Sequence, residues 1–271
     1  MENKVGDIRL IKTVLSEKIF SMKIFDVGFW LGRTSLFPLM SEGTVPLLTE
    51  IEQKYNIQGT LVSHWIDGKY SVDESNKFLI NSIKDKNNWY AVVTGLPIFP
   101  EKDGYKNILE DQILNEKVRG VRIYPTTYKF KPVEWCIGSL CETLIYNKIP
   151  LFIFHTETSF TDIQLLATSF PKLQIVLETQ IKKIIYHTRM LLPLMKKCSN
   201  VYTDISNLGA PGLLEYFIKN IGYERLLFSS YAPVNDPLVP IGLLLNENIS
   251  EIEQTGISGD NIRRLIKGDF L

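Results

Sequence analysis

The stretch Gly120-Val121-Arg122-Ile123-Tyr124-Pro125 is a short, largely apolar run that ends at a proline. The next such run, Pro150 to His155, follows a segment at 133–146 whose apolar residues recur at helical spacing. Both runs are nearly continuous in apolar residues rather than alternating, which is typical of strands buried on both faces of a parallel sheet. The order therefore predicts a strand, a helix and a second strand parallel to the first.

The same order of elements recurs along the chain. Helical spacing of apolar residues is also found at 78–84 and 213–220. Short apolar runs, each predicted to be a strand, lie at 22–27, 59–63, 90–95, 120–124, 150–155, 173–177, 200–205 and 225–230. Eight strand–helix units in 271 residues predict an α/β fold, a single-domain (β/α)8 TIM barrel. We expect an N-terminal segment at 1–21 and the barrel at 22–271.

A doubly wound open sheet is the main alternative, because periodicity alone does not show whether a sheet closes. Open sheets that bind dinucleotides carry a glycine-rich phosphate fingerprint after the first strand. The corresponding residues here, Asp26 to Trp30, contain a single glycine followed by two aromatic residues. This disfavours the open sheet, and the barrel predicts a functional site at the carboxyl ends of the strands.

Composition excludes several classes of protein. Thirty basic and thirty acidic residues give a formal net charge of zero, so there is no electrostatic footprint for a nucleic acid partner. Three cysteines exclude a disulfide framework or a four-cysteine zinc site, and three histidines limit any metal chemistry. No signal-peptide core and no apolar stretch of about 20 residues is visible, so we expect no membrane partner and a cytoplasmic location.

Six motifs in order resemble a known family. They are 120–125, similar to "GVKLYP"; 150–156, similar to "PVLIHTG"; 170–177, similar to "FPDLKIVLAH"; 200–206, similar to "NVYVDTS"; 225–233, similar to "RILFGSDYP"; and 259–265, similar to "GNARRLL". Together they resemble the amidohydrolase superfamily, in its branch of small metal-dependent hydrolases, decarboxylases and lactonases. The resemblance extends from about residue 22 to 267 and implies the barrel fold with a divalent metal, such as zinc, at the strand ends.

The resemblance also implies where that metal would be held. The ligands would be a His-x-His pair after the first strand, histidines after the fifth and sixth, and an aspartate after the eighth. In this sequence those positions are Gly28 and Trp30, His155, Thr179, and Tyr231. Only His155 is a metal ligand by chemistry, and the position of a metal-bridging lysine in some relatives is Arg122, which cannot coordinate a metal. We therefore predict a degenerate member that has lost the family's metal centre and uses no cofactor.

Three residues at predicted strand ends are the candidate catalytic residues, namely His155, Arg122 and Glu178. An imidazole at His155 suits general acid–base chemistry, and the guanidinium of Arg122 suits bidentate binding of a small anionic substrate. Each has an alternative. Arg122 can form a salt bridge with Asp26, Glu157 or Glu178 that fills the space of a lost metal site. His155 can be a packed, hydrogen-bonded side chain.

The candidate substrate-binding residues are Trp30, His64, Glu157 and Tyr231. Aromatic residues cluster at the predicted strand ends, where they can stack on a planar ligand or fill the cavity left by the metal. They are Phe29, Trp30, Trp65 and Tyr231. For His64, which ends the second strand, a structural role is the alternative, and His187 falls in a helical stretch and is expected on the surface.

These observations leave three functional hypotheses. In the first, the protein is a hydrolase or lyase that acts on a small anionic substrate without a metal. In the second, it is a catalytically inactive relative that binds a small molecule or a partner protein. In the third, a metal is held by a rearranged set, His64, His155, Glu178 and Asp204. The resemblance also implies a homodimer.

Overall fold

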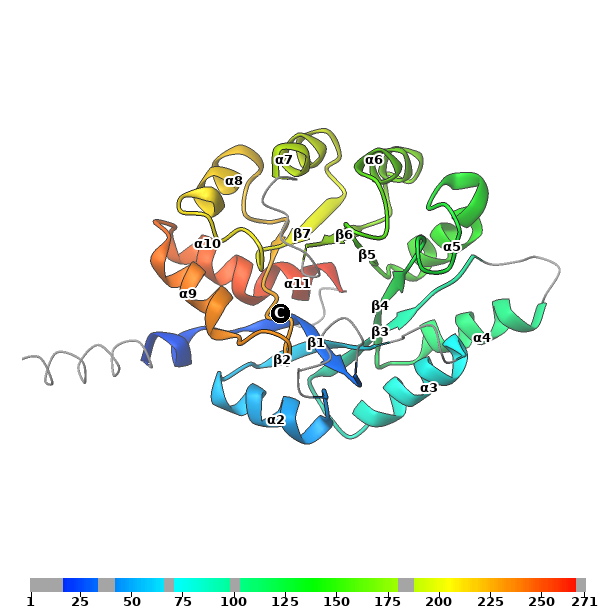
Figure 1. The fold of residues 1–271 in the computed structure, drawn as a ribbon, viewed down its shortest axis with the longest axis horizontal. Coiled ribbons are helices and arrows are strands. Elements are labelled where there is room, and N and C mark those ends of the chain that lie inside the picture. The colour runs from blue at the N-terminus through cyan, green and yellow to red at the C-terminus, as the bar shows by residue number, and fades with distance from the viewer. Residues whose placement is uncertain (1–16, 34–41, 66–70, 98–102, 180–187, 267–271) are drawn as a thin grey trace, which may run out of the picture.

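Eight parallel strands are hydrogen-bonded side by side in the order in which they occur along the chain (Figure 1). The computed structural model describes residues 17–33, 42–65, 71–97, 103–179 and 188–266. The strands are β1 (Phe25–Leu31), β2 (Gly59–His64), β3 (Trp89–Thr94), β4 (Val118–Ile123), β5 (Leu151–Phe154), β6 (Ile175–Glu178), β7 (Val201–Asp204) and β8 (Leu226–Leu227). Each pairs in parallel with the next, from β1 and β2 to β7 and β8.

Helices connect the strands and form an outer ring (Figure 1). They are α2 (Val45–Lys54), α3 (Val72–Ile83), α4 (Asp103–Leu114), α5 (Glu134–Asn147), α6 (Phe160–Ser169), α7 (Thr188–Lys197), α8 (Leu213–Ile221) and α9 (Leu238–Asn246). The chain then continues through α10 (Glu251–Thr255), the π-helical segment η1 (Gly256–Asp260) and α11 (Asn261–Leu265). No helix in the described part of the chain has both the length and the apolar character needed to cross a membrane.

The sheet closes on itself between its first and last strands. The amide of Val27 in β1 donates to the carbonyl of Phe228, at 3.1 Å, and the amide of Trp30 donates to the carbonyl of Ala232, at 2.9 Å. The carboxylate of Asp26 adds a side-chain link across this seam, because its Oδ1 accepts from the amide of Ser230 at 2.9 Å. The closure confirms the predicted single-domain barrel and excludes the open sheet.

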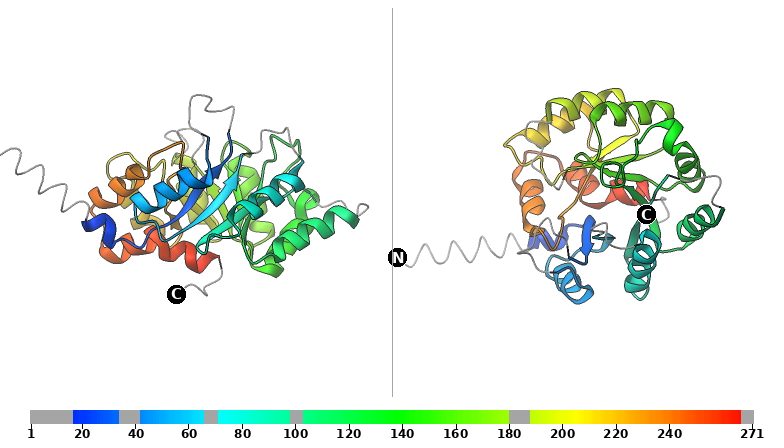
Figure 2. Two further views of the ribbon diagram at one scale, coloured as in Figure 1. Left: turned by 90° about the horizontal axis from the view of Figure 1, so that it is seen from below. Right: turned by 45° about the vertical axis from the view of Figure 1, so that its right-hand side comes forward.

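The barrel is filled by side chains in successive layers. Near the amino ends of the strands lies an apolar lower layer that includes Phe25, Leu61, Tyr90, Phe152, Val176 and Leu227. Ile262 and Ile266, from α11 and its carboxyl end, pack into the same layer. Helices α10 and α11 accordingly cross the end of the barrel where the strands begin (Figure 2, left). The functional site predicted by the barrel must therefore lie at the other end.

The observed elements follow the predicted ones, with shifted boundaries. The strand expected at 22–27 is β1, at 25–31, because pairing continues past a register irregularity between Asp26 and Phe29. The strand expected at 225–230 is reduced to the two residues of β8. The helix expected at 78–84 begins earlier, at Val72. The division at residue 21 stays a prediction, because residues 1–16 lie outside the described residues.

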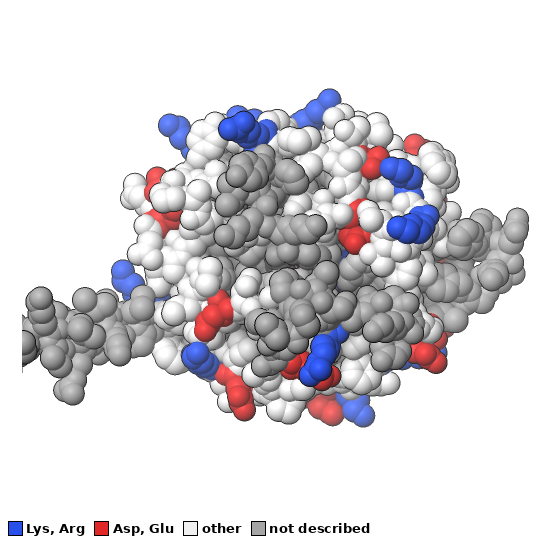
Figure 3. Space-filling model, viewed as in Figure 1, with Lys and Arg blue, Asp and Glu red and all other residues white. Residues whose placement is uncertain are grey.

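Charged side chains of both signs are interspersed around the face shown in Figure 3. Over the described residues of that face, no extended surface of a single sign is visible. This distribution matches the net charge of zero and gives no support to a phosphate-backbone partner on this face.

Candidate functional site

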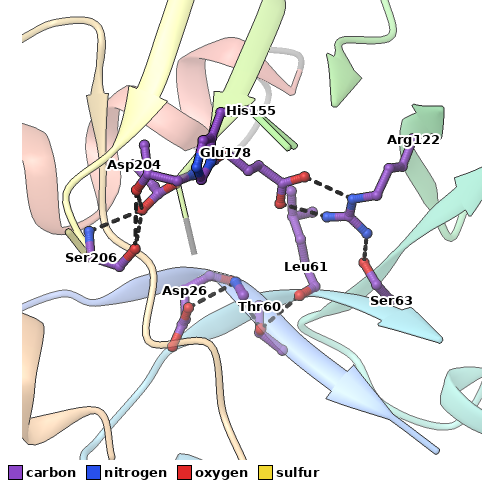
Figure 4. A network of polar contacts seen from close by, with 11 residues as sticks. Asp26, Thr60, Leu61, Ser63, Arg122, His155, Glu178, Asp204 and Ser206 are labelled. Carbon is purple, nitrogen blue, oxygen red and sulfur yellow. Dashed lines mark hydrogen bonds and ion pairs between the residues drawn. The ribbon is translucent and has the colours of Figure 1, made fainter. Parts of the chain in front are cut away.

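A buried ion pair crosses the barrel near the carboxyl ends of the strands (Figure 4). Alternation along β4 turns Val121 and Ile123 toward the helices and Arg122 into the barrel. The guanidinium Nε donates to Oε2 of Glu178, at 2.7 Å, and Nη2 donates to Oε1, at 2.6 Å. Its third nitrogen, Nη1, donates to the hydroxyl of Ser63. The guanidinium therefore links the ends of β2, β4 and β6.

Aromatic rings enclose the guanidinium. Its central carbon lies 4.5 Å from the ring centroid of Trp30, 5.1 Å from that of Phe154 and 5.7 Å from that of Phe152. Phe152 belongs to the lower layer, whereas Trp30 and Phe154 belong to a separate cluster above it. The side chain of Arg122 is consequently only 1% exposed, and cation–π attraction adds to the ion pair.

The upper cluster, which we call the aromatic layer, consists of Trp30, Trp65, Phe154 and Tyr231. The rings of Trp30 and Trp65 stack with centroids 4.1 Å apart, and Tyr231 meets Trp30 edge-on at 5.7 Å. All four side chains are buried. The indole N–H of Trp30 is buried without a hydrogen-bond partner, which is an uncommon state for a buried donor.

Burial and charge act in opposite directions on the ion pair. Burial alone would lower the pKa of Arg122, but the negative charge of Glu178 and the adjacent Tyr124 outweigh it, so that pKa is raised. Burial raises the pKa of Glu178, and the guanidinium opposes this increase. Because the carboxylate receives two short charge-assisted bonds, we treat the pair as ionised. Burial also raises the pKa of Tyr231, so its phenol is neutral at ordinary pH.

Two further buried carboxylates lie inside the barrel, on β7 and β1. Asp204 accepts from the amide of Thr179 at 2.7 Å and from the amide of Ser206 at 2.9 Å. Asp26 accepts on Oδ1 from the amides of Gly28, at 2.8 Å, and Ser230, whereas its buried Oδ2 has no partner. Burial raises the pKa of Asp26 to about 6, and the nearby charge of Asp204 contributes to the increase.

His155 adjoins the ion pair through the backbone. Its amide donates to the carbonyl of Glu178 at 3.0 Å, and its Nδ1 lies 3.2 Å from the same oxygen. A carbonyl oxygen can only accept, so this contact places the proton of a neutral imidazole on Nδ1 and leaves Nε2 as the acceptor. The ring is 5% exposed.

Two predicted substrate-binding residues lie apart from this cluster. Nδ1 of His64 pairs with the hydroxyl of Ser75 in α3 at 2.7 Å, and its ring lies beside Phe78. Glu157 accepts from the amide and the hydroxyl of Thr127, at 2.9 and 2.8 Å, in the segment between β4 and α5. The structure thus brings together Arg122, Glu178, Trp30, Tyr231 and His155. His187 lies outside the described residues.

Sequence reasoning missed two members of the site, Ser63 and Phe154. A signal was available for both, because strand alternation places Ser63 on the same side of β2 as Leu61, and Phe154 on the same side of β5 as Phe152. Because every residue of the run at 150–155 that forms β5 is apolar and buried, the sequence did not show which of its side chains face the barrel interior.

The described residues do not fit a divalent metal of the kind implied by the resemblance. Of the five positions of its ligands, only one holds a histidine, His155; the other four hold Gly28, Trp30, Thr179 and Tyr231, and a guanidinium lies beside Trp30. No group of three or more His, Cys, Asp or Glu side chains in the described ranges could hold a metal ion. The rearranged set is not assembled either, because His64 pairs with Ser75 and Glu178 with Arg122.

Comparison with known proteins finds this fold in solved structures. No family model and no curated protein sequence matches the chain. A 5-carboxyvanillate decarboxylase from Sphingomonas paucimobilis is 13% identical, with a TM-score of 0.69 over 91% of this chain and 99% of that one. Amidohydrolase 2 from Bifidobacterium longum subsp. infantis is 13% identical, with a TM-score of 0.65 over 92% and 100%.

A dihydroxybenzoic acid decarboxylase from Polaromonas sp. JS666, solved with manganese and the inhibitor 2-nitroresorcinol, is 14% identical. Its TM-score is 0.66 over 91% of this chain and 97% of the other. At such identities the likeness shows the fold alone. The chain therefore has the TIM-barrel fold of these amidohydrolases and decarboxylases.

Proposed function

We propose that this chain is a degenerate, catalytically silent relative of the amidohydrolase-type barrels, which binds a small planar anion instead of transforming it. The observation that carries the proposal is the Arg122–Glu178 pair. All three guanidinium nitrogens have protein partners within the barrel. Arg122 is therefore engaged by the protein itself and is not poised to clamp a substrate. Four of the five positions of the family's metal ligands hold residues that cannot bind a metal and so cannot help to activate water.

Two features support binding of a planar molecule. The aromatic layer places stacked, buried indole rings near the carboxyl ends of the strands, where barrels of this kind bind their ligands. The buried N–H of Trp30 has no partner and is a donor for an oxygen of a ligand. Structural neighbours have been solved with 2,6-dihydroxybenzoate and 2-nitroresorcinol, which are small planar aromatic molecules.

The proposal predicts binding without turnover. Protein treated with a chelator, and protein supplied with manganese or zinc, is incubated with 2,6-dihydroxybenzoate and 5-carboxyvanillate while substrate loss is followed. We expect none in either form, but a concentration-dependent change in tryptophan fluorescence on titration with one of these acids. The change should be lost in Trp65→Phe and kept in the matched control Trp135→Phe, whose side chain is 81% exposed on α5. Metal-dependent turnover, or no saturable binding, would overturn the proposal.

A metal-independent hydrolase or lyase is the second candidate, and the orientation of His155 favours it. With Nδ1 bonded to the carbonyl of Glu178, Nε2 is the basic atom and a general base is already in the required tautomer. This candidate predicts turnover of a lactone or a carboxylated ring that survives chelation and is lost in His155→Ala. Turnover unaffected by that substitution would reject it.

A further inference from the structure

Few charged side chains are buried in the described part of the chain. Only four Asp, Glu, Lys or Arg residues there are buried, namely Asp26, Arg122, Glu178 and Asp204, and each is at most 1% exposed. Arg122, Glu178 and Asp204 lie at or near the carboxyl ends of β4, β6 and β7, and Asp26, near the start of β1, bonds to the segment after β8 at Ser230. Burying a carboxylate without a counter-charge is costly. Because Arg122 is the one cation buried among three carboxylates in the described residues, it largely determines the electrostatics of the barrel interior.

We infer that the Arg122 guanidinium is a resident cation that takes the structural place of a divalent metal in this barrel. A metal in such a site would hold several strand ends together and neutralise buried carboxylates. Arg122 does both, because it links β2, β4 and β6 and pairs with Glu178 on both carboxylate oxygens. The inference does not depend on the proposed function, since it holds equally for a silent barrel and for a metal-independent enzyme.

The surroundings of the guanidinium match this role. Trp30 and Tyr231 occupy two of the positions at which the resemblance to the family implies metal ligands. Both belong to the aromatic layer above Arg122. The Trp30 ring lies 4.5 Å from the guanidinium carbon, so the residue at the ligand position contacts the cation through its ring face. Aromatic faces attract a cation but cannot coordinate a metal.

A lysine could not perform the same role. The guanidinium offers donors in a planar fork that matches a carboxylate bidentately, and it stacks on aromatic rings. Here two forked nitrogens meet Glu178 and the third meets Ser63, while rings lie against the planar group. An ammonium group carries its three donors on one nitrogen, so it has neither the planar fork that spans Glu178 and Ser63 nor a flat face to stack on the rings.

Thermal unfolding of single and double variants tests the inference. Arg122→Met keeps much of the side-chain volume but leaves the buried Glu178 carboxylate without its counter-charge. It should lower Tm by about 6–15 °C. The double variant Arg122→Met/Glu178→Met removes both charges and should recover at least half of that loss. Arg122→Lys should restore less than half. The control Lys54→Met removes one member of an exposed ion pair with Asp236 and should change Tm by no more than about 1–2 °C.

A second arm tests metal independence. The wild-type Tm should be unchanged by a strong chelator and by added manganese or zinc. A chelator-dependent loss of Tm would overturn the inference, as would an unimpaired Arg122→Met protein or additive losses in the double variant, which would indicate a role in packing alone. If Arg122→Met does not fold, Glu178→Gln replaces it, and the double variant must then be the more stable of the two.

Discussion

At the scale of single residues, Asp26 couples the closure of the barrel to pH. Its pKa rises from 3.8 to about 6 on folding, so the folded state binds this proton more tightly than the unfolded chain. The contribution is therefore fully present below about pH 4 and is lost as the pH rises through about 6. At neutral pH the ionised carboxylate, with Oδ2 unpartnered, costs on the order of 3 kcal/mol.

Asp26→Asn should therefore raise stability at pH 7 by about 1–3 kcal/mol and leave it little changed at pH 4. The amide oxygen can still accept from Gly28 and Ser230. Urea unfolding at a series of pH values measures this, with the exposed Asp85→Asn as the matched control. A variant that is less stable than wild type at pH 7 would show that the carboxylate is needed in its ionised form.

The carboxylate partner of Arg122 could not be predicted from the sequence. Sequence placed Arg122 at a strand end and allowed three carboxylate partners, Asp26, Glu157 and Glu178. The structure selects Glu178, on β6, which is not adjacent to β4 in the sheet. That choice depends on how far each side chain reaches across the closed barrel, which no local pattern encodes. Glu157 instead binds the segment beside it, at Thr127.

At the scale of elements, the continuous apolar runs predicted the strands because both faces of each strand are buried, against helices outside and the layers inside. Boundaries were less predictable where pairing depends on tertiary contacts. The first strand extends to Leu31 through its pairing with β2, and the chain after β8 continues to bond with β1 at Ala232. Neither contact is visible in the local sequence.

Gly120 in β4 shows how close the packing inside the sheet is. A Cβ at this position would lie 2.6 Å from Cε2 of Phe152 and 3.1 Å from Cγ2 of Val92, both in the lower layer. Gly120→Ala should therefore destabilise the protein by about 1–3 kcal/mol through overpacking. The matched control is Gly138→Ala in α5, where the nearest atom, in Phe170, is 3.7 Å away and helix propensity favours alanine. Denaturant midpoints should fall in the first variant and not in the second.

At the scale of the whole molecule, the two ends of the barrel differ in the kind of side chain that they bury. The amino end is apolar and is closed by a helix that follows the last strand, with the amide of Phe228 bonded to the carbonyl of Ile257 in η1. Three of the four buried Asp, Glu, Lys and Arg side chains of the described residues, those of Arg122, Glu178 and Asp204, lie at or near the carboxyl ends of their strands. Apolar packing and most of the buried charge are therefore separated along the barrel axis.

This separation predicts that the amino end can be weakened without altering the site. Ile262 of α11 is buried in the lower layer, whereas Ile252 of α10 is 71% exposed. Ile262→Ala should lower the free energy of unfolding by about 2–5 kcal/mol, and Ile252→Ala should change it by less than about 0.5 kcal/mol. Both should keep the wild-type ligand-induced fluorescence change under native conditions. A loss of that change in folded Ile262→Ala would mean that packing at the amino end is transmitted through Phe152 to Arg122, and that the two ends are not independent.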